Sequence, residues 1–64
     1  MIELHYLDGS TFYLNMQRIE RFYADAANGC TIVILSGGGD IAVQEEPRQI
    51  LHAIREARHA GVLG

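Results

Sequence analysis

Turn signals interrupt the first 45 residues of this chain at short intervals. Asp8-Gly9, Asn28-Gly29 and the glycine run 37–39 are residue types that favour tight turns. Between these turns apolar and polar residues alternate over short stretches, which is the period of a half-buried strand. We therefore expect strands in the following ranges: 2–7, 10–15, 19–24, 30–36 and 40–45.

The first two predicted strands can pair in two ways. A two-residue loop at 8–9 would bring side chains from opposite faces together, which is costly because side chains alternate with a period of two. A three-residue loop, Leu7-Asp8-Gly9, pairs Leu4 with Phe12 and keeps one face apolar. It also puts Gly9 at the left-handed position of a type I turn with a G1 bulge. We predict the three-residue loop.

The segment 46–60 is predicted to be a helix. Apolar residues recur there with helical spacing. Pro47 suits the first helical position, and the negative charges of Glu45 and Glu46 suit the N-terminal end. Gly61 is a natural C-cap, so we expect the helix to end there.

These elements predict a single α+β domain over residues 1–64, in which a small antiparallel sheet or open barrel of about five strands precedes one C-terminal helix. One helix can cover one face of such a sheet, so the other face should expose side chains. The alternation places His5, Tyr13 and Tyr23 on that face. An exposed and partly apolar surface of this kind is typical of a contact site. We therefore take these three residues as candidates for interaction.

The size of the chain also points to a partner. Below about 70–80 residues a single core is marginal, and small proteins are commonly stabilised by a disulfide, a metal or association. Cys30 is the single cysteine, so it cannot form an internal disulfide, and we expect it to be a small buried thiol. We expect a protein partner or self-association as a homo-oligomer.

The composition argues against several kinds of function. The 64 residues contain no lysine, which excludes a P-loop lysine and a lysine Schiff base. The net charge of −3 disfavours non-specific nucleic-acid binding, since that is driven by phosphate neutralisation. The carboxylates are scattered, and several lie beside turns where Asp is structurally favoured. We therefore predict no catalytic residues, no cofactor and no enzyme.

Three residues on the predicted helix carry metal-binding groups. His52, Glu56 and His59 lie along one helical stripe, and two imidazoles with a carboxylate could in principle bind zinc. The two histidines are seven positions apart, however, too far for both to reach one ion unaided. We interpret the stripe as a solvated polar face and predict no metal site.

The expected compartment is the cytoplasm. No stretch approaches the ~18 apolar residues of a membrane span. The first residues lack the basic start and apolar run of a signal peptide. A lone thiol also fits a reducing environment.

The order of motifs resembles the FlbD/SwrD family of small flagellar-motility proteins. The similarity is carried by Leu7-Asp8-Gly9, Ile19-Glu20, the apolar strand 31–35 and Val43-Gln44-Glu45 before the helix, and it covers nearly the whole chain. It implies a cytoplasmic accessory protein of the flagellar motor or of swarming motility. No catalytic residues come with the family.

Three functional hypotheses follow. The first is a non-enzymatic flagellar accessory module that acts by protein contact. The second is a homo-oligomeric β adaptor or scaffold of unrelated origin, for example from a phage or plasmid. The third is a small-barrel nucleic-acid binder that resembles the LytTR type of DNA-binding domain and would use arginines and tyrosines.

Overall fold

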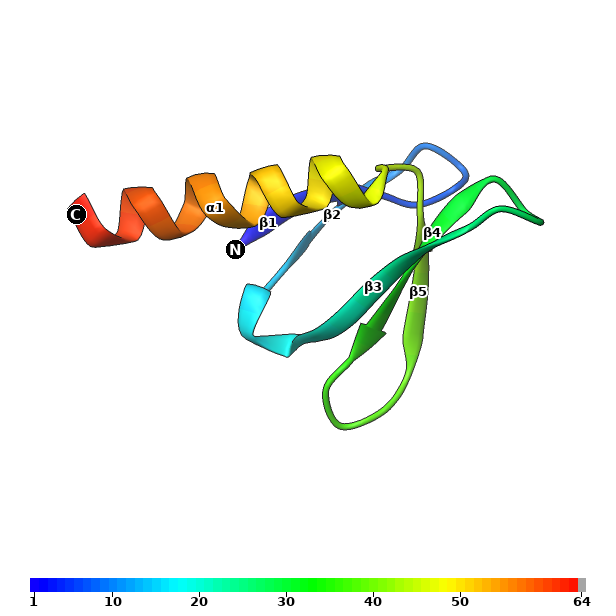
Figure 1. Cartoon of the computed structure of the whole chain (residues 1–64), viewed down its shortest axis with the longest axis horizontal. Coiled ribbons are helices and arrows are strands. Elements are labelled where there is room, and N and C mark those ends of the chain that lie inside the picture. The colour runs from blue at the N-terminus through cyan, green and yellow to red at the C-terminus, as the bar shows by residue number, and fades with distance from the viewer. Residues whose placement is uncertain (64) are drawn as a thin grey trace.

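The computed structural model describes the backbone of residues 1–63 and the side chains of residues 1–59. It confirms the predicted α+β class, with five strands followed by one C-terminal helix (Figure 1). The elements are, in chain order, β1 (Ile2–His5), β2 (Thr11–Leu14), the short 3-10 helix η1 (Met16–Arg18), β3 (Ile19–Asp25), β4 (Cys30–Leu35), β5 (Asp40–Val43) and α1 (Pro47–Leu63).

The strands form two antiparallel sheets, β1–β2 and β3–β4–β5. An isolated bridge between Tyr6 and Val43 joins the end of β1 to the end of β5. The Gln44 N–H also donates to the His5 carbonyl at 2.9 Å. The strands therefore run in the spatial order β2-β1-β5-β4-β3, and the two sheets lie at an angle to each other beneath the helix (Figure 1).

The first hairpin has the predicted register and loop. Leu4 lies opposite Phe12, and the Tyr6 N–H donates to the Ser10 carbonyl across a loop of residues 7–9. Gly9 has φ 95°, a conformation that only glycine adopts without strain. Within the loop, the hydroxyl and the N–H of Ser10 donate to Asp8 Oδ1. These two hydrogen bonds lower the pKa of Asp8.

The core lies between the helix and the inner faces of the two sheets. Leu4, Val33 and Ile50 are fully buried and come from β1, β4 and α1. The two-stranded sheet, the three-stranded sheet and the helix therefore share one core. Fully burying one such side chain contributes about 1.5–3 kcal/mol. The buried core cluster consists of Ile2, Leu4, Val33, Val43, Ile50 and Ile54. Cys30 is buried as predicted, although it lies outside this cluster.

The helix begins at Pro47, as predicted. The Glu46 N–H donates to Gln49 Oε1 at 2.8 Å, which satisfies a backbone donor next to the first turn. The predicted end at Gly61 is wrong, because α1 continues to Leu63. A glycine inside a helix costs about 1 kcal/mol relative to alanine, which is not enough to stop a helix whose neighbouring residues favour it.

Several strands are shorter than their predicted ranges by one or two residues at an end, whereas β3 extends one residue further, to Asp25. Strand β1 ends at His5, and the next residue, Tyr6, bridges Val43 of β5 before the hairpin loop begins at Leu7. Strand β5 stops at Val43 because Gln44 and Glu45 turn towards the helix.

Candidate functional site

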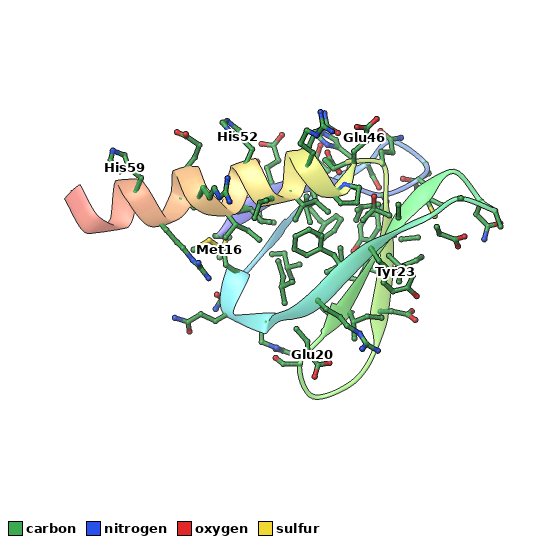
Figure 2. The ribbon with its side chains drawn as sticks, in the orientation of Figure 1. Met16, Glu20, Tyr23, Glu46, His52 and His59 are labelled. Atoms are coloured by element: carbon green, nitrogen blue, oxygen red, sulfur yellow. The ribbon has the colours of Figure 1, made fainter. Side chains whose placement is uncertain are left out.

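The outer face of the three-stranded sheet carries apolar side chains that are turned away from the core and are half-buried or exposed. Val33 points into the core, so its neighbours Ile32 and Ile34 point to the opposite face. Strand register places Tyr23, Ile32 and Ala42 in one row across the sheet. Tyr23 is 48% exposed at the border of this row, and Figure 2 shows it on β3, away from the helix.

A second row on the same face carries charges at both ends. Arg21 on β3 and Asp40 on β5 lie opposite Ile34 of the central strand, one on each side. The apolar centre is thus bordered by one basic and one acidic side chain. We use the name outer sheet surface for the following set: Arg21, Tyr23, Ile32, Ile34, Asp40 and Ala42.

Tyr13 forms a second exposed aromatic position on the other sheet. It lies opposite Glu3 in the β1–β2 hairpin and is 64% exposed. Its neighbour Phe12 turns the other way, packs against the core and stacks on Tyr6 with ring centroids 4.1 Å apart. The hairpin therefore presents Tyr13 to solvent because Phe12 is held inward.

His5, the third predicted residue, is held in a contact between two parts of the fold. Its Nδ1 lies 2.5 Å from Glu45 Oε2, and its backbone N–H donates to Glu45 Oε1 at 2.9 Å. Its Nε2 lies 3.7 Å from Glu3 Oε2. The ring is 34% exposed, so one edge still reaches solvent. We call this contact the His5–Glu45 clamp.

The clamp changes the interpretation of Glu45. The sequence placed this carboxylate at the helix N-terminus, but the structure turns it back to β1. Burial alone would raise the pKa of Glu45, but the hydrogen bonds from the ring and the backbone N–H of His5 outweigh burial and hold the pKa below its usual value. Glu45 is therefore ionised at neutral pH and joins β1 to the segment before the helix.

The three predicted residues do not share one sheet. His5 and Tyr13 lie on the outer face of the hairpin, whereas Tyr23 belongs to the three-stranded sheet. Sequence reasoning missed Ile32 and Ile34 as surface residues. A signal for them was present, because residues 32–35 are apolar at successive positions, so that apolar side chains lie on both faces of β4.

The histidines of the helix lie away from this surface. His52 and His59 project from the side of α1 that is turned away from the sheets (Figure 2). Among residues 1–59, whose side chains are described, no group of three His, Cys, Asp or Glu side chains comes together in a way that could hold a metal ion.

A shallow hollow of about 320 Å³ lies where the β3–β4 turn meets the start of the helix. Asp25, Cys30, Gln44 and Pro47 are among the residues that line it. The Cys30 thiol is nearly closed off from solvent there. The hollow is open to solvent, so it encloses little of any small molecule that enters it.

These observations define a small two-sheet α+β protein whose distinctive features are an apolar outer sheet surface and an exposed tyrosine on each sheet. The chain belongs to the FlbD family of flagellar and swarming motility proteins, whose family model matches residues 1–61. The resemblance seen in the sequence is thereby confirmed. No curated protein and no solved structure matches the chain. Within residues 1–63, no helix has the length and apolar character needed to cross a membrane.

Proposed function

We propose that this motility-related protein is a non-enzymatic accessory that acts in the cytoplasm by binding another protein chain. The observation that carries the proposal is the outer sheet surface, where the exposed Tyr23 and the half-buried Ile32 and Ala42 form an apolar row on the face turned away from the core. Exposed apolar patches with a polar border are characteristic of protein–protein contact.

The chemistry of the surface supports contact with protein. Tyrosine supplies a large apolar ring with one polar end, which is why tyrosine is enriched at interfaces. Arg21 and Asp40 lie on opposite borders of the surface. They would fix the orientation of a bound partner, because the partner must present an acidic group to Arg21 and a basic group to Asp40. The exposed ring of Tyr13 offers a second contact point on the hairpin.

A role that depends on contact is also compatible with the FlbD family. A protein that assists swarming or flagellar rotation without chemistry of its own must act by changing the assembly or state of another component. Because the chain belongs to the FlbD family, we take motility as the process in which the proposed contact acts.

Deleting the gene in its native host tests the motility role. We expect reduced swimming and swarming at an unchanged growth rate, with recovery when the wild-type gene is supplied. Supplying the double variant Tyr13→Ser/Tyr23→Ser should not restore motility, although the protein should accumulate to the wild-type level. Normal swimming and swarming in the deletion strain would overturn the proposal.

A further inference from the structure

Strand β3 has one unpaired edge. It pairs with β4 on one side, and within residues 1–63 no backbone hydrogen bond joins its other side to a further strand. Unpaired edges are templates for pairing with another chain. We propose that a second copy of this chain pairs with this edge in antiparallel orientation, about a two-fold axis that passes beside Tyr23. This inference rests on the proposed function in one respect, since both use the surface around Tyr23.

The hydrogen bonds of the neighbouring strands show how β3 is oriented. The Leu35 N–H donates to the Gly39 carbonyl at 3.0 Å, so Leu35 directs its backbone groups towards β5. Backbone groups alternate in direction along a strand. Ile32, three positions earlier, therefore directs its groups towards β3, where its register partner is Tyr23. Tyr23 accordingly directs its own backbone groups towards β4.

The neighbours of Tyr23 in β3 follow from the same alternation. Phe22 and Ala24 direct their N–H and C=O groups to the free edge. In a two-fold antiparallel pair centred on Tyr23, Phe22 of each copy lies opposite Ala24 of the other. The backbone N–H and C=O groups of Phe22 then form hydrogen bonds with those of Ala24 in the other copy. On the inner face of the sheet, the large side chain of Phe22 lies beside the small side chain of Ala24.

Charge favours this register over registers centred on Arg21 or on Phe22. Centring the pair on Arg21 would set two arginines face to face. Centring it on Phe22 would place Asp25 opposite the apolar Ile19. Centring it on Tyr23 places Arg21 of each copy opposite Asp25 of the other, so two pairs of opposite charge form at once. Opposite charges directly across a strand pair stabilise it, and like charges destabilise it.

The tyrosines meet at the centre of this arrangement. Tyr23 would lie opposite Tyr23 of the second copy at a non-hydrogen-bonded position, where Cα atoms approach to about 4.5 Å and side chains are closest. The apolar row of Ala42, Ile32 and Tyr23 would then continue across the two-fold axis into the same row of the second copy. The two three-stranded sheets would share one outer surface of six strands.

The charged groups are available for this contact. Asp25 Oδ2 accepts a hydrogen bond from Asn28 Nδ2 at 2.8 Å, which leaves Oδ1 for an arginine. Arg21 is exposed and forms no ion pair within the described part of the chain. Neither group must break a salt bridge before it can join the pair.

A charge exchange tests the pairing. We expect the mass of the wild-type chain in solution, measured by sedimentation, to rise from that of a monomer to that of a dimer with concentration. Arg21→Asp and Asp25→Arg should each weaken the dimer about tenfold or more, because each places like charges opposite one another. An equimolar mixture of the two variants should recover the dimer, because each now carries the charges that the other needs. A wild-type chain that stays monomeric, or two folded variants that do not associate when mixed, would overturn the inference.

Disulfide trapping gives a second test that does not depend on the charge variants. Cα atoms at a non-hydrogen-bonded pair lie within the range that a disulfide can bridge. We expect Tyr23→Cys in a Cys30→Ser background to form a covalent dimer on mild oxidation. Tyr13→Cys in the same background is the matched control, since Tyr13 is more exposed than Tyr23, and it should cross-link far more slowly. Equal cross-linking of the two variants would contradict the pairing.

Failure here and failure of the proposed function are separable. A chain that remains monomeric would remove the two-fold pairing and leave the motility role to the deletion experiment. A dimer in a strain whose motility does not need the gene would leave the pairing in place and remove the function.

Discussion

Replacing Glu45 with glutamine should weaken the His5–Glu45 clamp and lower the stability of the whole chain. The carboxylate accepts hydrogen bonds from both the ring and the backbone N–H of His5. Hydrogen bonds to charged groups contribute about 1.5–3 kcal/mol each, and neutral ones about 0.5–1.5 kcal/mol. The amide of Glu45→Gln is neutral and can accept through one oxygen.

The expected loss is moderate because the clamp is partly solvated. The side chains of Glu45 and His5 are 18% and 34% exposed, so water competes for both bonds. We therefore expect the free energy of unfolding to fall by about 1.5 kcal/mol rather than by the full value of two charged bonds. In a domain of this size 1 kcal/mol shifts the Tm by about 4–8 °C, so the Tm should fall by about 6–12 °C.

The assay is urea unfolding at pH 7, followed by the helical circular dichroism signal. Glu46→Gln is the matched control, because it makes the same change one residue away. In the described residues the Glu46 carboxylate accepts no hydrogen bond, and Glu46 uses its backbone N–H instead. We expect the control to change stability by less than about 0.5 kcal/mol. Equal unfolding free energies for the two variants would refute the clamp as a source of stability.

The same pair of proteins should show a pH dependence with a definite sign. The pKa of Glu45 is lowered in the folded chain, so its contribution is present above the ordinary value of 4.5 and is lost as the pH falls through the lower folded pKa. The difference between wild type and Glu45→Gln should therefore shrink in acid. A difference that stays constant from pH 7 into that range would contradict the ionised clamp.

Two further substitutions test the core and the first hairpin. Leu4→Ala should lower the free energy of unfolding in urea by about 3 kcal/mol, because Leu4 is fully buried. The control Leu7→Ala, in the exposed loop, should change it by less than about 0.5 kcal/mol. Similar losses for both variants would place the core elsewhere. Gly9→Ala should lower the free energy of unfolding by about 1 kcal/mol or more, since φ at Gly9 is 95°. An unchanged midpoint of urea unfolding would contradict the left-handed turn.

Local rules were enough to predict most of the fold. The loop and register of the first hairpin follow from keeping Leu4 and Phe12 on one face, and the structure has that register. The start of the helix follows from Pro47. Each of these features depends on residues close together in the sequence, where the side-chain period and turn chemistry leave few alternatives.

Long-range contacts could not be predicted in the same way. His5 and Glu45 are 40 positions apart, and they meet because β1 bridges the end of β5. No local pattern indicates that bridge. The curl of the strands also separates Tyr13 from Tyr23 onto two sheets, whereas the alternation alone placed both on one face.

If the outer sheet surface mediates the role in motility, single substitutions on it should impair swarming. The swarming of strains that carry such variants measures this directly. Tyr23→Ser changes that surface, and Leu51→Ser changes another exposed apolar side chain, on the helix. At equal protein levels and with equal helical signals, we expect Tyr23→Ser to reduce swarm expansion towards that of the deletion strain and Leu51→Ser to swarm like wild type. Wild-type swarming of the Tyr23→Ser strain would show that the outer sheet surface is not needed for motility.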